Sequence, residues 1–448
     1  MSSFFQNGRW RVDLQDIDSA LMHGAFWALG VNASGMLLGF LTQAILAKTL
    51  GVHGYGLYLT VLGWSNVAGL VCALEFANAS VRYVSAYTAE GNWGALRGFL
   101  RRSHQIVGGT TVAVGVTGAL VLLIVRSPDN EAKDLAFLVG CALFPLTSLV
   151  QLQAGCLLGW KRIRHSQGPF QIARPAIFAV GLLLVSRMMG ANFEAAHAVM
   201  VQFVATGIAL LATAWYLRQL TPVKAVSIEP VYHTREWIQT SLHFVAISMA
   251  QLVLSTQADV LFVSALLGTT QAGLYGGASQ FATLVGFGST AIMMIAQPMI
   301  ADLYARGRYT ELGKLSRNVV MLTLVASLPV FIVVVLSGRW LLHFYRPEFT
   351  AAYPVLVVLA VSQLASAVVG GLLGYLFTMT SHQEIATKII GGTAVLNLVL
   401  APILTMRYGM IGTASATVIA TLVRSVALAL AGRNILKRMR AEAQAAAA

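Results

Sequence analysis

The sequence predicts an all-α integral membrane protein with about twelve transmembrane helices, arranged as two pseudo-symmetric halves of six. Three observations predict it: the apolar composition, the number of membrane-length apolar runs, and an internal repeat. Of the 448 residues, 57% are hydrophobic and 10% are charged, and the mean hydropathy is +0.72. Soluble domains carry about 25% charged residues. Lipid is therefore the main solvent of this chain.

Twelve runs of the sequence are apolar over the length of about 20 residues that a bilayer-spanning helix needs. They cover residues 23–47, 54–80, 105–126, 134–159, 168–190, 194–217, 237–266, 270–301, 318–338, 350–378, 386–406 and 409–432. The short connections predict no appended soluble domain. The sequence thus divides into an N-terminal segment (1–22), a first lobe (23–220), a linker (221–236), a second lobe (237–435) and a tail (436–448).

The distribution of Lys and Arg among the loops predicts the orientation of the chain. If both termini lie on one side, that side holds 21 of the 30 basic residues and the opposite side holds 7. The remaining two, Arg174 and Arg424, lie within spans. Because cytoplasmic loops carry an excess of Lys and Arg, we expect both termini in the cytoplasm. Basic loops facing anionic lipid headgroups account for most of the net charge of +13, and no motif suggests a nucleic-acid partner.

An internal repeat links the two halves. The stretch LGVHGYGLY (50–58) recurs as LGTTQAGLY (267–275), displaced by 217 residues. In each half it joins an odd-numbered span to the next, and a long span and a short basic segment follow. Because an even number of spans separates the copies, the repeat is parallel. Such halves are typical of secondary transporters with the substrate path between them. A channel or a scaffold is the alternative interpretation.

The chain resembles a known family at several of these places. The L-G-x4-G-L-Y turn, SVRYVSAY (80–87), the basic amphipathic segment after it and NLVLAPILTMRYGMIGTASATVIATLV (397–423) are similar to the polysaccharide transporter family. These are flippases for lipid-linked oligosaccharides, within the multidrug/oligosaccharidyl-lipid/polysaccharide exporter superfamily. One stretch departs from the family pattern: LEFANAS (74–80) stands where members often carry a D-L-G-like sequence.

The resemblance implies two six-helix lobes that form a V-shaped central cavity and open alternately to each side. It implies translocation of an undecaprenyl-diphosphate-linked oligosaccharide across the bacterial inner membrane, for O-antigen, exopolysaccharide or capsule assembly. The expected partners are that lipid-linked substrate, membrane lipids, a polysaccharide polymerase and chain-length proteins, and the expected state is a monomer. No cofactor, metal or catalytic residue is expected. The alternatives are a multidrug or cation antiporter and a flippase for the peptidoglycan precursor lipid II.

Asp259 is a charged residue within a predicted span. Burying such a charge in a bilayer is energetically costly, so charged residues there are usually functional. On a straight helix, Ser241, Ser248, Gln251, Ser255 and Asp259 share an arc of about 80°. This polar stripe predicts that Gln251, Ser248 and Ser255 line a cavity. Asp259 then carries a coupling ion or neutralises Arg424. A hydrogen bond to a neighbouring helix is the plainer alternative.

Arg424 shares a second arc of about 80° with Thr413, Thr417 and Thr421. A guanidinium matches phosphate oxygens in bidentate geometry, so Arg424 is a candidate for binding the substrate diphosphate, with Thr417 and Thr421 lining the cavity. A structural ion pair is the alternative role.

In the first lobe, Arg174 and Arg82 stand beside the single acid Glu75. This excess of positive charge favours an anionic substrate. The arginine side chains could instead snorkel to the cytoplasmic surface. Glu75 could pair with Arg174 or carry a coupling ion.

Two further observations narrow the function. No nucleotide-binding loop is present, so an ion gradient, the membrane potential or product consumption would drive transport. A membrane glycan polymerase would need a large outer loop with acid and base residues, whereas the longest outer connections, near 126–134 and 338–350, are short. The sequence therefore predicts a transporter and not an enzyme.

Overall fold

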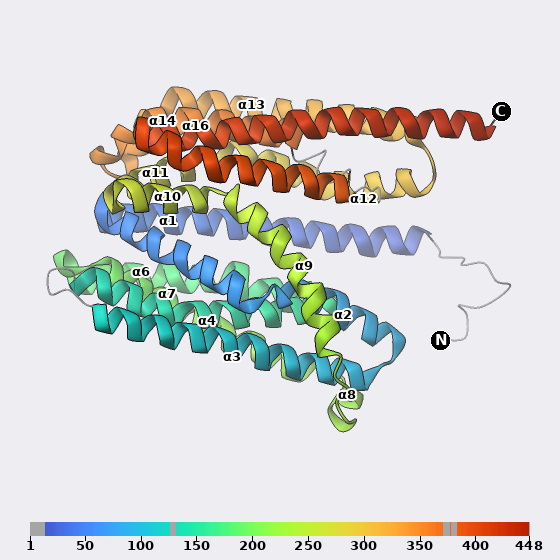
Figure 1. Cartoon of the computed structure of the whole chain (residues 1–448), viewed down its shortest axis with the longest axis horizontal. Coiled ribbons are helices and arrows are strands. Elements are labelled where there is room, and N and C mark those ends of the chain that lie inside the picture. The colour runs from blue at the N-terminus through green and yellow to red at the C-terminus, as the bar shows by residue number, and fades with distance from the viewer. Residues whose placement is uncertain (1–13, 126–130, 371–376, 378–382, 448) are drawn as a thin grey trace.

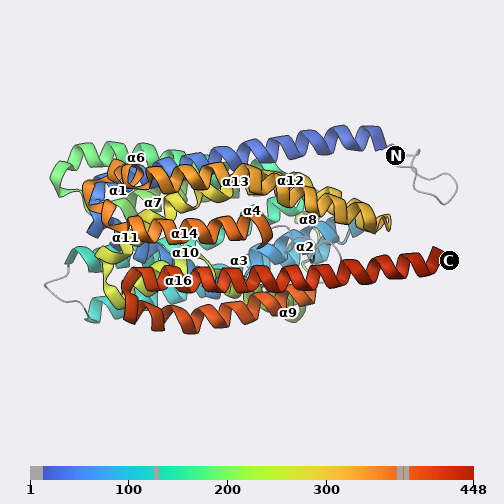
Figure 2. The ribbon, with the colours of Figure 1, turned by 90° about the horizontal axis from the view of Figure 1, so that it is seen from above.

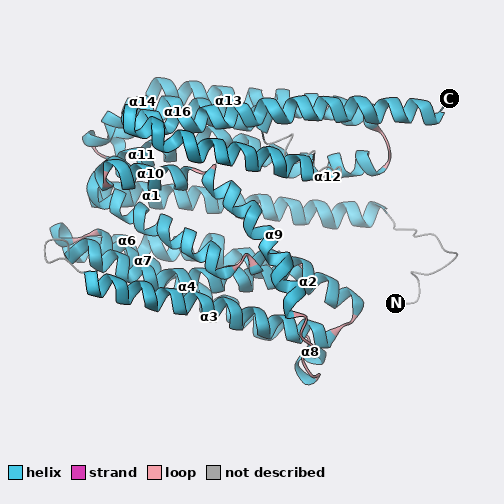
Figure 3. Ribbon diagram, viewed as in Figure 1, coloured by secondary structure: helices cyan, strands magenta, loops and turns pink. Residues whose placement is uncertain are grey.

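The computed structural model describes residues 14–125, 131–370, 377 and 383–447, and every secondary-structure element in these ranges is a helix (Figure 3). Three of the 28 loop cations counted above, Arg9, Arg11 and Arg126, lie outside the described residues. Most of the predicted N-terminal segment and the end of the tenth predicted span lie outside them as well. The fold is that of an all-helical membrane protein, as the sequence predicts.

The first half consists of long helices interrupted by short breaks. They are α1 (Leu14–Ala73), α2 (Phe76–Glu90), α3 (Trp93–Val125), α4 (Glu131–Gly159), α5 (Ile163–Gln167), the π-helix η2 (Gly168–Ala173), α6 (Arg174–Met189), the 3-10 turn η3 (Gly190–Asn192) and α7 (Ala195–Leu220). The short α8 (Val223–Ser227) lies in the linker.

The second half repeats this plan with different breaks. Its helices are α9 (Thr234–Val253), α10 (Thr256–Leu267), α11 (Thr269–Ala282), α12 (Leu284–Ala305), α13 (Tyr309–Tyr345), the 3-10 helix η4 (Pro347–Ala352), α14 (Tyr353–Ala365), the π-helix η5 (Ser366–Gly370) and α16 (Gln383–Ala447). The predicted C-terminal tail is a continuation of α16 as far as Ala447.

Among the described residues, eight helices are long and apolar enough to cross a membrane, or nine if the bent pair α9 and α10 counts as one span. The longest two, α1 and α16, contain non-helical glycines, Gly51 (φ 68°) and Gly409 (φ 61°). Figure 1 shows each of these helices folding back on itself, so each supplies two passes. Glycine suits these positions because a positive φ is strained for other residues.

The helices form two groups, an N-lobe from α1 to α7 and a C-lobe from α10 to α16 (Figure 1). The start of α1 and the end of α16 lie at the same end of the molecule in both views (Figures 1 and 2). We call this the terminal end and the other the distal end.

The two copies of the internal repeat meet at the distal end. Gly56 of α1 packs directly on Gly273 of α11, and these are equivalent positions 217 residues apart. A Cβ on Gly56 would overlap the carbonyl oxygen of Thr269 and lie 2.6 Å from the Gly273 nitrogen. His53 Nδ1 lies 3.2 Å from Thr270 Oγ1, again across equivalent positions. We call this contact the distal seam; it explains physically why the motif occurs twice.

At the terminal end, α9 packs on the N-lobe although it begins the second half. Trp237 Nε1 donates a hydrogen bond to Tyr87 Oη of α2 at 3.0 Å, and the Tyr83 hydroxyl lies 2.8 Å from Thr240 Oγ1. The linker also contacts the N-lobe, because the Val231 amide donates a hydrogen bond to the Gly94 carbonyl of α3 at 2.9 Å. The linker and α9 therefore cover one side of α2 and α3.

Candidate functional site: a polar cavity between the lobes

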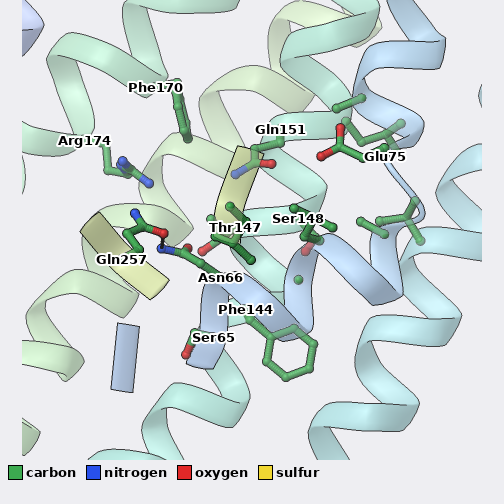
Figure 4. A pocket seen from close by; sticks show the side chains of 17 residues that line it. Ser65, Asn66, Glu75, Phe144, Thr147, Ser148, Gln151, Phe170, Arg174 and Gln257 are labelled. Atoms are coloured by element: carbon green, nitrogen blue, oxygen red, sulfur yellow. Dashed lines mark hydrogen bonds between the residues drawn. The ribbon is translucent and has the colours of Figure 1, made fainter. Parts of the chain in front are cut away.

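A cavity of about 350 Å³ lies against α1, α4 and α6 of the N-lobe and touches α9 and α10. We call it the central chamber (Figure 4). Its charged lining residues are Arg174 and Glu75. Its neutral polar lining residues are Ser65, Asn66, Thr147, Ser148, Gln151 and Gln257. The structure thus brings together two of the charges that the sequence singled out.

Arg174 is the first residue of α6, directly after the π-helix η2. Pro175 cannot donate a backbone hydrogen bond, which fits the π-helical turn before it. The Arg174 guanidinium carbon lies 4.3 Å from the Phe170 ring centroid. Arg174 Nε is buried and has no hydrogen-bond partner in the protein. A donor left unpaired in this way is available to a ligand oxygen.

A second chamber of about 230 Å³ adjoins the central chamber, and most of its lining residues belong to the N-lobe. Tyr58 and Gln202 line this inner N-lobe chamber, and Gln202 Oε1 is also buried without a partner. Arg174 therefore lines both chambers.

Glu75 lies at a break in the second span, between α1 and α2. Leu74 (φ 49°) and Glu75 (φ 53°) both have left-handed backbone conformations. Such conformations cost roughly 1–3 kcal/mol each in non-glycine residues and concentrate at functional sites. This is the stretch that departs from the family pattern.

The Glu75 carboxylate accepts a hydrogen bond from Asn78 Nδ2 at 2.7 Å, and the Ser248 hydroxyl of α9 is a further partner. Figure 4 shows Glu75 and Arg174 on opposite sides of the central chamber. Within the described part of the chain no ion pair joins them. The Arg174 guanidinium and the Glu75 carboxylate therefore face the central chamber as two separate charges.

Asp259 lies elsewhere, fully buried inside the C-lobe (0% exposed). It accepts hydrogen bonds from the Tyr275 hydroxyl at 2.8 Å and from Thr417 Oγ1 at 2.9 Å. It does not line the chambers described here. In this conformation Asp259 makes hydrogen bonds to neighbouring helices, which is the alternative to a coupling role given in the sequence analysis. Its coupling role stays a prediction.

The tyrosine of the repeat faces opposite charges in the two lobes. Tyr275 binds the carboxylate of Asp259, whereas Tyr58, at the equivalent position 217 residues earlier, shares the inner N-lobe chamber with Arg174. One duplicated motif therefore holds an anion in one lobe and stands beside a cation in the other.

Arg424 and Asp259 have separate partners. Arg424 Nη2 donates to Ser366 Oγ at 3.3 Å. Thr417, which binds Asp259, lies seven residues before Arg424, about 10 Å along the helix. Thr421 accepts a hydrogen bond from Ser362 at 3.2 Å, so this stripe packs against other C-lobe helices and does not line the described chambers. Binding of the diphosphate by Arg424 remains a prediction.

The polar stripe expected on a straight seventh span is wrong, because the span bends by 63° between α9 and α10. Ser255 lies at the bend and donates to the Leu252 carbonyl at 2.6 Å. Ser248 faces Glu75, and Gln251 is exposed on α9 outside the described chambers. Arg82 is exposed on α2, with its guanidinium 5.7 Å from the Tyr83 ring centroid, and it does not line the central chamber.

Sequence reasoning missed the neutral polar residues of the site. Asn66, Gln257, Tyr58 and Gln202 are uncharged residues within spans, and a search for charges passes over them. Asn397 was missed as well: it is fully buried, and its Nδ2 donates at 2.9 Å to the Val253 carbonyl at the end of α9. Amides inside predicted spans were the available signal.

Two family models match the sequence over most of its length. Residues 21–304 match the model of the polysaccharide biosynthesis protein family, and the chain belongs to that family. Residues 245–403 also match the MatE family model. The sporulation protein YkvU of Bacillus subtilis (strain 168) is 23% identical over 331 residues, 69% of this chain and 72% of that protein.

Solved structures share the fold at low sequence identity. An inward-facing multidrug resistance MATE transporter of the MOP superfamily superposes with a TM-score of 0.75 at 13% identity, covering 90% of this chain and 95% of that one. An outward-facing MATE transporter gives 0.60 at 14% identity, covering 92% and 96%. A MOP superfamily transporter from Pyrococcus furiosus gives 0.60 at 13% identity, also covering 92% and 96%.

Proposed function

We propose that this protein is a flippase that moves an undecaprenyl-diphosphate-linked oligosaccharide across the bacterial inner membrane by alternating access. It serves surface polysaccharide assembly, acts without catalysis and has both termini in the cytoplasm. The membership of the polysaccharide biosynthesis protein family supports this proposal. The observation that carries it is Arg174, a half-buried cation whose buried Nε has no hydrogen-bond partner, at a cavity lined by amides and hydroxyls.

The chemistry of the cavity fits both parts of such a substrate. A guanidinium binds phosphate oxygens with charge-assisted hydrogen bonds, and Arg174 is in contact with an aromatic ring and not with an acid. The neutral amides and hydroxyls are suited to the many donors and acceptors of a glycan. An unneutralised arginine within a span is costly, and an anionic substrate would offset that cost.

The conformation supports loading from the terminal end. The distal seam joins the lobes at Gly56 and Gly273, so the cavity is closed on that side. The higher TM-score to an inward-facing transporter, 0.75, than to an outward-facing one, 0.60, agrees with this. With cytoplasmic termini, this is the state that receives the substrate made in the cytoplasm.

Transport in proteoliposomes tests the proposal. The full-length protein is reconstituted with a fluorescent undecaprenyl-diphosphate oligosaccharide, and a membrane-impermeant quencher reports which leaflet it occupies. We expect Arg174→Ala to abolish translocation and Arg174→Lys to restore part of it, because Lys is a point charge without the guanidinium fork. Arg187→Ala, an exposed arginine on the same helix α6, is the matched control and should be fully active. Normal translocation by Arg174→Ala would exclude the substrate role of this residue.

A multidrug or cation antiporter is the second candidate, because residues 245–403 match the MatE family model and Glu75 places a carboxylate in the central chamber. It predicts that cells lacking their own exporters gain resistance to cationic dyes when they express this protein, and that Glu75→Gln abolishes that resistance. Lipid II in the same proteoliposome assay tests the remaining alternative.

A further inference from the structure

A third chamber lies between the lobes and differs from the other two in charge. This inter-lobe chamber has a volume of about 180 Å³ and is formed by α1, α10 and α11. None of the described residues that line it is charged. Its polar side chains include Gln43, Tyr55, Asn66, Gln257, Ser279 and Gln280. Arg174 and Glu75 belong to the chambers on the N-lobe side only.

Asn66 and Gln257 stand at the junction of all three chambers. Asn66 comes from α1 of the N-lobe and Gln257 from α10 of the C-lobe, and Asn66 Nδ2 donates to Gln257 Oε1 at 3.3 Å (Figure 4). Along α1, Asn66 lies ten residues from Gly56, about 15 Å from the distal seam. The order along the cavity is therefore the central chamber, the Asn66–Gln257 pair, the inter-lobe chamber and the seam.

The two amides retain unused hydrogen-bonding capacity. A side-chain amide has two donors and two acceptor positions, and the bond between Asn66 and Gln257 uses one of each. Gln43 is oriented by the Tyr55 hydroxyl, which donates to Gln43 Oε1 at 3.2 Å, so its NH₂ group remains a donor. A chamber with such donors and acceptors and no charge suits a neutral ligand that carries several hydroxyl groups.

We propose that the inter-lobe chamber is the subsite for the neutral glycan and that Asn66 and Gln257 determine recognition of the sugar. This rests on the proposed flippase function. The diphosphate binds at Arg174, and the sugar attached to it extends past the amide pair into the uncharged space. Because the two amides belong to different lobes, sugar hydroxyls that replace their mutual hydrogen bond link occupancy of the subsite to separation of the lobes.

Binding of two lipids by the purified full-length protein in nanodiscs tests this subsite. The probes are undecaprenyl diphosphate and the same lipid carrying a neutral glucose-initiated oligosaccharide. We expect Asn66→Ala and Gln257→Ala each to weaken binding of the glycosylated lipid about tenfold, because each variant loses its hydrogen bonds to the sugar and leaves the sugar hydroxyls unpaired. Binding of the bare lipid should stay unchanged, which also shows that the variants are folded.

Thr60→Val is the matched control. Thr60 Oγ1 donates to Ser264 Oγ at 2.8 Å, so it too bonds across the lobes, but neither residue lines a chamber described here. It should leave the ratio of the two affinities unchanged, and Arg174→Ala should weaken both lipids. If the amide variants weaken both lipids equally, or neither, the glycan subsite is wrong while the flippase proposal stands. If the unmodified protein binds neither lipid, both proposals fail.

Discussion

Replacing Gly56 with alanine should open the distal seam. The added Cβ would overlap the carbonyl oxygen of Thr269 and lie 2.6 Å from the backbone nitrogen of Gly273. Both atoms belong to the backbone of α11, so no side-chain rotation can relieve the overlap. The clash exists only while the lobes touch, because its two sides belong to different lobes.

The size of the effect follows from this geometry. Overpacking a tight contact costs about 1–3 kcal/mol. The closed seam would lose that amount relative to an open one, which lowers the ratio of closed to open molecules about 5- to 150-fold. Gly273→Ala should act in the same way, since its Cβ would overlap the Val52 carbonyl oxygen and lie 3.0 Å from the Gly56 nitrogen.

Electron–electron distance measurements between spin labels provide the assay. Cysteines replace Lys133 of α4 and Arg407 of α16, both exposed near the distal end of their lobes, after removal of the native Cys72, Cys141 and Cys156. We expect both glycine variants to shift the distance distribution to longer values.

Gly39→Ala is the control for the seam variants, because Gly39 lies on the same helix α1 and a Cβ there meets no atom within 4 Å. It should leave the distances unchanged. An unaltered distribution in Gly56→Ala would refute the conclusion that the repeated motif holds the lobes together.

Three other predictions concern the charges and the topology. If Asp259 carries a coupling ion, Asp259→Asn should abolish gradient-driven translocation while lipid binding survives. Recovery of transport in the double variant with Arg424→Gln would instead show that the two residues form a charge pair. Normal transport by Asp259→Asn would leave Asp259 only a packing role. Glu75→Gly should be more stable in detergent than Glu75→Gln by about 1 kcal/mol, and so melt at a higher temperature, because glycine relieves the left-handed strain at φ 53°. Equal melting temperatures would show that the backbone at this break is unstrained. Reporter fusions after residue 130 should report the periplasm and those after residue 228 the cytoplasm, as 21 of the 28 loop cations require; the reverse pattern would overturn the orientation.

The bend in the seventh span shows where sequence reasoning stops. Neither proline nor glycine stands at Leu254 and Ser255, so nothing local predicts the 63° bend. Asn397 pairs the Val253 carbonyl there, and it comes from 144 residues further along the chain. A break stabilised by a distant partner has no local signal. The stripe of polar residues expected on a straight helix was wrong for this reason.

The site was predictable in part. The depth of Arg174 and Glu75 in their spans identified them as costly charges, and the structure places both at the central chamber. The same reasoning singled out Asp259, but its hydrogen bonds to Tyr275 and Thr417 depend on how three helices pack. Sequence spacing predicts the face of a helix that is polar, not the neighbour that this face meets.

By itself, the sequence determined the fold class and the twofold plan of this protein, because a bilayer requires each crossing segment to satisfy its own backbone hydrogen bonds and so to be an apolar helix. The repeated L-G-x4-G-L-Y motif was equally visible. Only the tertiary structure decided that its glycines form the seam, that Tyr58 stands beside Arg174 while Tyr275 binds Asp259, and that Asn66 meets Gln257 between the lobes. The physical reason is that such contacts join residues from 16 to 217 positions apart, whose proximity depends on helix packing and not on local sequence.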